Sequence, residues 1–213
     1  MSQSAPWPTL RRGLVAILRG VTPGEAVAIA RVVHAAGIEA IEIPLNSPEP
    51  FKSIASLAAA LPDALIGAGT VLTRDDVDRL HAAGGRLLVS PNVDGIVLAH
   101  AARHGMVTMP GVFTPTEAFL ALRHGASALK FFPANVIGAA GIAAMRAVLP
   151  KETIVGAVGG VSDGDFPAYA KAGVSVFGLG SSLYKPGMTA ADVGERARKA
   201  VAAWDALHGE VSA

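Results

Sequence analysis

One unit of sequence decides the fold, and its clearest copy is RHGASALKFFP, residues 123–133. The unit begins with a basic helix end, continues with a glycine that can adopt the left-handed conformation of a helix stop, and closes with an apolar, strand-like run. The same kind of glycine stop follows a helical stretch at Gly37, Gly84, Gly105, Gly125 and Gly173. The unit therefore predicts a chain built from repeats of helix, stop and strand.

The alternation extends over the whole chain. Short apolar runs bounded by glycine or proline predict strands at residues 14–18, 40–44, 65–69, 86–90, 106–109, 128–132, 153–158 and 174–179. Strands that alternate with helices of crossover length form a parallel sheet, and eight such units predict a closed (β/α)8 TIM barrel. The alternative is an open doubly wound sheet. Both folds place ligands at the carboxyl ends of the strands.

Composition limits the function classes. The 213 residues are 51% hydrophobic, which predicts a single domain of residues 1–213 with an irregular lead-in at residues 1–12. Because 18 Lys and Arg are balanced by 17 Asp and Glu, we expect a small-molecule ligand and no nucleic acid. The absence of cysteine excludes thiolate nucleophiles and cysteine metal sites. No run resembles a signal peptide or a membrane helix, so we expect a cytoplasmic protein.

Lys130 is a charged residue in an apolar strand. An ammonium removed from water tends to lose its proton, and the neutral amine is a nucleophile that condenses with a ketone to give a Schiff base. The alternative is a lysine whose stem lies on apolar surface while its amine reaches water. Lys130 therefore indicates a carbonyl substrate.

Glu42 is the predicted partner of Lys130. It lies five residues after Gly37 in the second strand, and Lys130 lies five residues after Gly125 in the sixth. Equal offsets on two even-numbered strands suggest one layer of the barrel interior. A carboxyl group beside a Schiff-base lysine can move protons at the substrate. The alternative is an ordinary ion pair at the strand end.

Two glycine-bearing turns predict a phosphate site. Gly159 and Gly160 follow the seventh strand, and Gly180 and Ser181 follow the eighth. In barrels the loops after these strands often hold a phosphate through backbone amides and a short helix. A phosphorylated ligand is therefore predicted.

Thr70 and Arg19 are candidate ligand contacts at other strand ends. Thr70 follows the small residues Gly-Ala-Gly, and its hydroxyl can bind a carboxylate or carbonyl oxygen, with helix capping as the alternative. Arg19 follows the first strand, where its guanidinium can bind an anion.

The histidines predict no metal chemistry. His100 and His104 have the spacing of a helical metal pair, but the sequence offers no third ligand nearby. We therefore expect surface histidines and a reaction without metal or other cofactor.

These motifs form a recognisable set: Leu-Lys-Phe-Phe-Pro around Lys130, Glu-Ile-Pro-Leu from Glu42, Gly-Ala-Gly-Thr-Val at 67–71, and the pair Gly159-Gly160. From about residue 14 to the last helix, the chain resembles the 2-keto-3-deoxy-6-phosphogluconate and 2-dehydro-3-deoxy-6-phosphogalactonate aldolases. The resemblance implies a metal-free class I aldolase on a (β/α)8 barrel, usually a homotrimer. It implies that Lys130 forms the Schiff base, that Glu42 is the general acid and base, and that Thr70 contacts the pyruvate moiety. It implies a phosphate cradle of Gly159, Gly160, Gly180 and Ser181.

Two positions separate the members of this family. The gluconate-type enzymes have arginine and threonine where this chain has Asn46 and Val158, and both departures resemble the galactonate type. The expected reaction is cleavage of 2-dehydro-3-deoxy-6-phospho-D-galactonate to pyruvate and D-glyceraldehyde 3-phosphate. The sequence Phe-Phe-Pro-Ala at 131–134 instead resembles the gluconate type, so the C4 epimer is the alternative substrate.

The remaining expectations concern the rest of the substrate site. Because Asn46 replaces an arginine, the role of gripping a carboxylate or the phosphate moves to Arg19. Pro91 and Phe132 complete the predicted substrate-binding set. Two further alternatives are a barrel isomerase or decarboxylase, in which Lys130 is only an ion-pair partner of Glu42, and a phosphosugar-binding module without catalysis.

Overall fold

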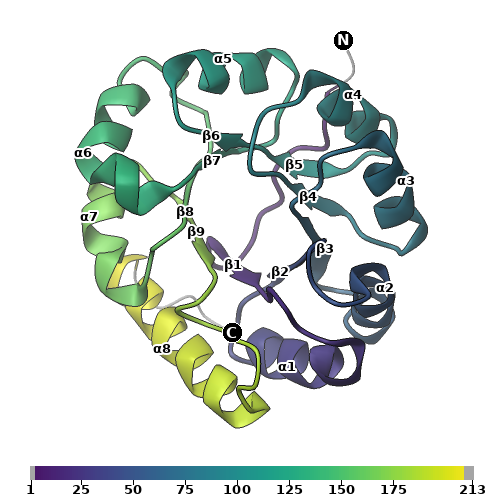
Figure 1. Ribbon diagram of the computed structural model, residues 1–213. Coiled ribbons are helices and arrows are strands. Elements are labelled where there is room, and N and C mark those ends of the chain that lie inside the picture. Colours follow the sequence, from purple (N-terminus) through teal and green to yellow (C-terminus); the bar gives the residue numbers. More distant parts are fainter. Residues whose placement is uncertain (1–2, 209–213) are drawn as a thin grey trace.

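The structure is a computed structural model that describes residues 3–208, in which helices surround a ring of parallel strands (Figure 1). The strands are β1 (Leu14–Ile17), β2 (Ala40–Pro44), β3 (Leu65–Gly69), β4 (Leu87–Val89), β5 (Val107–Met109), β6 (Gly111–Val112), β7 (Leu129–Phe131), β8 (Val155–Val158) and β9 (Val176–Leu179). The helices are α1 (Pro23–Ala35), α2 (Pro50–Ala60), α3 (Arg74–Ala82), α4 (Gly95–Arg103), α5 (Pro115–Arg123), α6 (Ala134–Arg146), the 3-10 helix η1 (Asp163–Asp165), α7 (Phe166–Lys171) and α8 (Ala190–His208).

The ring closes at the fifth predicted strand. The strand order is β5-β4-β3-β2-β1-β9-β8-β7-β6, and its two ends, β5 and β6, are consecutive pieces of chain separated by Pro110. Proline has no amide hydrogen and interrupts the ladder. The chain around β7 forms hydrogen bonds on both sides of the break. The Ala128 N–H donates to Thr108 O (3.1 Å) before it, and the Phe132 N–H donates to Val112 O (3.1 Å) after it. The (β/α)8 barrel is confirmed, with the fifth strand split in two, and the open sheet is wrong.

Helix ends follow local sequence signals. Helices α1, α3 and α5 begin with capping boxes, in which a threonine and an acidic residue three positions later satisfy each other's backbone amides. All five predicted glycine stops have positive φ: Gly37 (105°), Gly84 (79°), Gly105 (63°), Gly125 (74°) and Gly173 (87°). These signals fix where each helix turns back toward the next strand.

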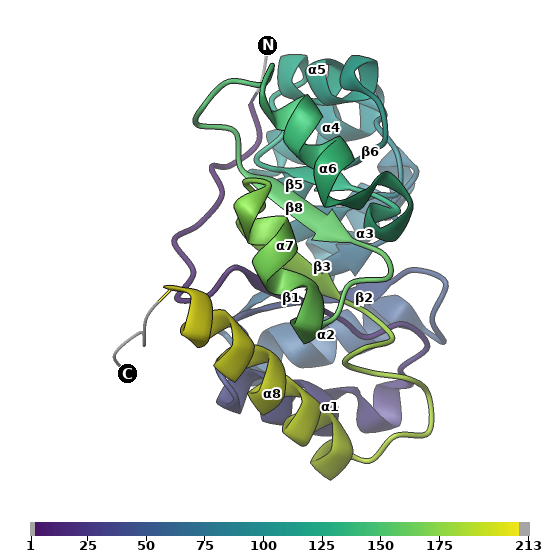
Figure 2. The same ribbon diagram turned by 90° about the vertical axis from the view of Figure 1, so that its left-hand side faces the viewer.

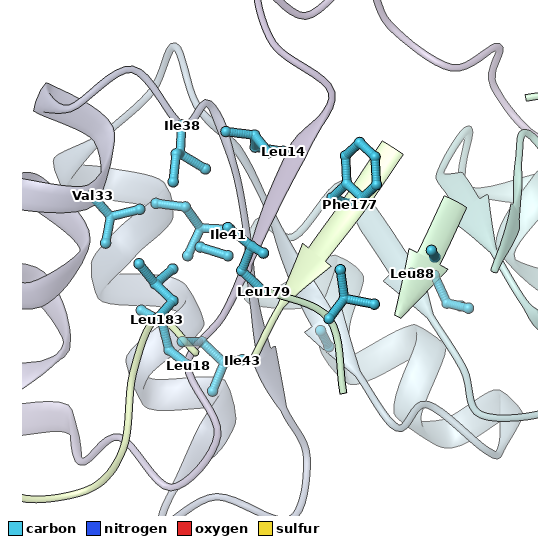
Figure 3. Packing of buried hydrophobic residues seen from close by; sticks show 14 of the residues in the cluster. Leu14, Leu18, Val33, Ile38, Ile41, Ile43, Leu88, Phe177, Leu179 and Leu183 are labelled. Atoms are coloured by element: carbon cyan, nitrogen blue, oxygen red, sulfur yellow. The ribbon is translucent and has the colours of Figure 1, made fainter. Parts of the chain in front are cut away.

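The strands are buried on both faces, which is why they contain few polar residues. One set of side chains packs between strands and helices and includes Leu14, Ile41 and Phe177 (Figure 3). A second set fills the barrel: Val15, Ile17, Ala40, Leu65, Leu87, Val89, Val107, Met109, Ala128, Val158 and Val176.

The N-terminal segment covers the amino end of the barrel (Figure 2). Ala5 forms a parallel bridge with Val107, and Trp7 and Leu10 pack against the side chains that fill the barrel. The opposite end, where the strands end in loops, therefore remains for a ligand. In the described part of the chain, every helix is too short or too polar to cross a membrane.

Candidate active site

Glu42 and Lys130 project into the carboxyl half of the barrel from β2 and β7. They are the only charged residues in the buried class within residues 3–208, at 3% and 6% exposure. Glu42 lies opposite Ile17 of β1 and Gly67 of β3, and Lys130 lies opposite Gly111 and Gly156. Charged groups are almost never buried unless they are paired, so this placement indicates function.

Burial moves the two pKa values toward each other. Desolvation raises the pKa of Glu42 to about 7, although the charges of Lys130 and Arg19 oppose the shift. Desolvation lowers the pKa of Lys130 to about 8, with Glu42 opposing the shift and Arg19 adding to it. The Oε2 atom of Glu42 has no hydrogen-bond partner in the protein. Near neutral pH the site thus holds a lysine that loses its proton far more readily than an exposed lysine, and a carboxyl group that can gain or lose a proton.

Small residues of β3 make room for the carboxyl group. A Cβ added at Gly69 would lie 2.0 Å from Glu42 Oε2, so only glycine fits beside the carboxyl group in this position. The space that Gly69 leaves is therefore occupied by Glu42. Thr70 follows at the mouth, half-buried and with a φ of 60°. Its alternative role as a helix cap is wrong, because Thr73 caps α3.

Arg19 and Asn46 meet at the mouth of the barrel. The Arg19 Nη1 atom donates a hydrogen bond to Asn46 Oδ1, and both side chains are exposed. The loops that carry them are joined by a hydrogen bond from the Gly20 N–H to Ser47 Oγ (2.9 Å). Since the charge of Arg19 lowers the pKa of both Glu42 and Lys130, its guanidinium lies within electrostatic reach of the pair.

Phe132 connects the lysine to the first glycine turn. The Lys130 Nζ atom lies 4.7 Å from the centre of the Phe132 ring, a cation–π contact. The ring also packs on Gly159, where an added Cβ would lie 3.1 Å from Phe132 Cδ2. Val158, the last residue of β8, is buried next to this turn. The structure thus places Phe132 beside the amine and joins it, through its ring, to the first glycine turn.

Pro91 occupies a different place from the other predicted contacts. It follows β4, and its carbonyl group packs on Gly111, where an added Cβ would lie 2.3 Å from the Pro91 oxygen. Gly111 is the β6 residue opposite Lys130. In this structure Pro91 therefore supports the strand beside the lysine through its backbone.

The two glycine turns lie side by side after β8 and β9. The Ser182 hydroxyl donates a hydrogen bond to Val161 O (2.9 Å), which joins them. Gly160 and Ser181 are exposed. An added Cβ at Gly180 would meet no atom within 4 Å. The turns therefore leave exposed backbone at this edge, as an anion site requires.

The sequence reasoning missed Asn135 at this edge. Its backbone N–H donates to Gly159 O (3.1 Å), and its side chain packs on Gly160, where an added Cβ would lie 2.5 Å from Asn135 Cγ. The available signal was a polar residue two positions after the proline that follows the lysine strand. Asn135 is thus a candidate contact for a ligand held by the turns.

The expectation that His100 and His104 have no third ligand nearby is wrong. The Asp78 Oδ1 atom lies 2.7 Å from His100 Nε2 and 2.9 Å from His104 Nε2. Asp78 belongs to α3, His100 belongs to α4, and His104 caps the C-terminal end of α4, so all three lie outside the barrel.

The family model described as KDPG and KHG aldolase matches residues 9–199. A "Probable 2-dehydro-3-deoxy-6-phosphogalactonate aldolase" of Rhizobium meliloti (strain 1021) is 57% identical over 205 residues, covering 96% of this chain and 97% of the relative.

Solved structures agree with this match. One described as "Native KDPGal structure" superposes with a TM-score of 0.93 at 43% identity, covering 96% of this chain and 100% of the other. A KDPG aldolase of Legionella pneumophila, with pyruvate captured at low pH as a covalent carbinolamine intermediate, gives a TM-score of 0.79 at 25% identity, covering 97% and 100%.

Proposed function

Because the chain belongs to the KDPG and KHG aldolase family, we propose that it cleaves 2-dehydro-3-deoxy-6-phospho-D-galactonate into pyruvate and D-glyceraldehyde 3-phosphate through a Schiff base on Lys130. The observation that carries the proposal is the buried pair of Lys130 and Glu42, with a pKa of about 8 for the amine and about 7 for the acid. A pair whose pKa values are shifted into the neutral range is suited to nucleophilic and proton-transfer chemistry at one substrate.

The first steps form the imine. The neutral Lys130 amine attacks the C2 ketone to give a carbinolamine, and Glu42 in its protonated form donates the proton with which water leaves. The resulting iminium ion accepts an electron pair. The ion pair with Glu42, the runner-up role for Lys130, would leave the amine protonated and unable to attack.

Carbon–carbon cleavage follows from the iminium ion. Glu42, now a carboxylate, takes the proton of the C4 hydroxyl group, the C3–C4 bond breaks, and its electrons move to C3 and the imine as an enamine. The aldehyde leaves as D-glyceraldehyde 3-phosphate. Glu42 then returns the proton to C3, and water hydrolyses the imine to release pyruvate and the free amine. One carboxyl group thus serves every proton transfer.

The remaining site residues hold the two ends of the substrate. We assign the phosphate to the edge formed by Gly159, Gly160, Gly180 and Ser181, with Asn135 beside it, because the turns are joined and open. We assign the substrate carboxylate to Thr70 and Arg19. Asn46 orients the Arg19 guanidinium, which accounts for an asparagine where relatives of the gluconate type have arginine.

Borohydride trapping tests the imine. Pyruvate plus borohydride should inactivate the protein and add a reduced pyruvate adduct to Lys130, located by peptide mass spectrometry, with EDTA making no difference. Lys151, an exposed lysine, provides the control position and should stay unlabelled. An unlabelled Lys130 would exclude the Schiff base and leave the isomerase, decarboxylase or binding-module alternatives.

Pyruvate release from the two C4 epimers, measured side by side, tests the substrate. We expect a higher kcat/KM for the galactonate epimer because Asn46 and Val158 match the galactonate type. A higher value for the gluconate epimer would make 2-keto-3-deoxy-6-phosphogluconate the substrate and would keep the aldolase mechanism.

We also propose a homotrimer. Apolar side chains remain exposed beside the mouth of the barrel, among them Phe113 (46%) after β6 and Val136 (66%) in α6. Their burial between subunits would remove apolar surface from water. Light scattering of the purified protein tests the assembly, and a monomer at working concentration would contradict it.

A further inference from the structure

We propose that Asp78, His100 and His104 form a zinc-binding site on the outer layer of helices, separate from the active site. The ligand atoms are Asp78 Oδ1, His100 Nε2 and His104 Nε2, and all three lie within 4.8 Å of one another. Two imidazole nitrogens and one carboxylate oxygen, with water in the remaining position, are a common ligand set for Zn²⁺.

Secondary structure places the ligands. His100 lies in the last turn of α4 and His104 caps that helix, so the two rings have the i, i+4 spacing that puts side chains on one face. Helix α3 packs against α4 and supplies Asp78 (Figure 1). Such a site would join two helices that are otherwise connected through β4.

The contacts already orient both rings toward one point. The Nε2 atoms of His100 and His104 share a single carboxylate oxygen, at 2.7 Å and 2.9 Å. His81 packs on the His104 ring with centroids 4.3 Å apart, which holds the plane of the ring. The Asp78 side chain is 54% exposed and free to turn either oxygen toward an ion. A cation at this point would replace two hydrogen bonds with three ligand bonds.

The same geometry determines the affinity for Zn²⁺ that we expect. His100 Nδ1 is buried and has no hydrogen-bond partner in the protein, whereas histidine ligands normally donate that second N–H to a partner. With three protein ligands, one of them exposed, we expect micromolar rather than tighter affinity for Zn²⁺.

The site lies away from the reaction. In a (β/α)8 barrel the helices run opposite to the strands, so the C-terminal end of α4 is at the amino end of the barrel. Lys130 and Glu42 act at the carboxyl end. Occupation of the zinc site should therefore change stability and leave pyruvate release unchanged.

Zinc titration of the tag-free, full-length protein tests the proposal. Calorimetry with ZnCl₂ should show one saturable site per chain, and Zn²⁺ should raise the thermal midpoint. The His104→Gln and Asp78→Asn variants should lose at least tenfold in affinity, with the midpoint no longer moving. His34→Gln, which changes a histidine in the last turn of α1, should behave like the wild type.

A second measurement needs no variant. In the wild-type protein labelled with ¹⁵N-histidine, Zn²⁺ should shift the Nε2 signals of two histidines together at one equivalent. The proposal is overturned if the wild-type protein shows no saturable binding, if His104→Gln binds as tightly as wild type, or if no pair of histidines shifts together.

Discussion

The two halves of the barrel interior are built from the same strands and differ in what fills them. The amino half contains apolar side chains such as Val107 and Val176, and the N-terminal segment covers it. The carboxyl half contains Glu42 and Lys130, and one carboxylate oxygen there has no partner. Buried apolar side chains stabilise the fold, whereas buried charges cost free energy. The amino half thus offsets the cost of a reactive carboxyl half.

Lys130→Met would make the carboxyl half resemble the amino half. Without the amine no imine forms, and we expect turnover to fall on the order of 10⁵- to 10⁶-fold, as when a covalent nucleophile is removed from other enzymes. A buried charge disappears, methionine packs well on an aromatic ring such as Phe132, and Glu42 can stay protonated because the charge of Lys130 no longer lowers its pKa. The free energy of unfolding should therefore rise by about 1–3 kcal/mol. Pyruvate release and urea unfolding measure the two effects. Lys151→Met, at an exposed position, should change neither.

Glu42→Gln keeps the shape of the site and removes its proton transfer. General acid and base catalysis contributes roughly 100- to 10,000-fold, so kcat should fall by that factor while borohydride still traps pyruvate on Lys130. Glu39→Gln, at the amino end of the same strand, removes only a partly exposed ion pair with Arg11 and should retain full activity. Equal losses in both variants would contradict the assignment.

The stability of the protein should depend on pH through Glu42. Its pKa is about 7 in the folded state against an ordinary 4.5, so the folded state holds the proton more tightly. The contribution is fully present below pH 4.5 and is lost as the pH rises through 7, on the order of 3 kcal/mol in total. Lys130, with a folded pKa of about 8, remains protonated over most of this range and adds little to the slope.

Urea unfolding at several pH values between about 4.5 and 7.5 measures this dependence. Glu42→Gln should become more stable relative to the wild type as the pH rises. Two parallel curves would show that Glu42 titrates in the folded protein as it does in water.

Two glycines of β3, Gly67 and Gly69, should separate an effect on stability from an effect on activity. Alanine at Gly69 would meet the end of the Glu42 side chain, which can move, so activity should fall about 100-fold with little loss of stability. Alanine at Gly67 would lie 1.9 Å from the backbone oxygen of Leu87, which cannot move alone, so the cost should be about 1–3 kcal/mol of stability. Kinetics and thermal unfolding of both variants give the comparison, and the reverse pattern would refute it.

The sequence predicted the fold because each of its signals is local. Glycine stops and apolar runs act within a few residues, and the barrel follows from their repetition. The matching offsets of Glu42 and Lys130 from their glycine stops predicted one shared site, and both residues are buried in the carboxyl half of the barrel.

What the sequence could not provide depends on packing between distant residues. Asp78 reaches His100 only because α3 and α4 pack together, and no spacing along the chain indicates that contact. The same holds for Gly69 beside Glu42 and for Asn135 beside Gly160. Pro110 is visible in the sequence, but the sequence does not show that it splits the fifth strand. The split depends on which backbone amides form hydrogen bonds where the barrel closes.

Val158 lies at the boundary between the halves and should give the smallest effect. It belongs to the apolar filling, yet it ends β8 directly before the Gly159-Gly160 turn. Threonine has nearly the same size and adds one hydroxyl, whose hydrogen bond to a substrate is worth about 0.5–1.5 kcal/mol. Val158→Thr should therefore move the ratio of kcat/KM toward the gluconate epimer by roughly 3- to 10-fold. Val176→Thr, in the amino half, should lower stability because its hydroxyl is buried without a partner, and it should leave the epimer ratio as it is. If both variants moved the ratio equally, epimer choice would depend on the whole interior and not on the layer that touches the substrate.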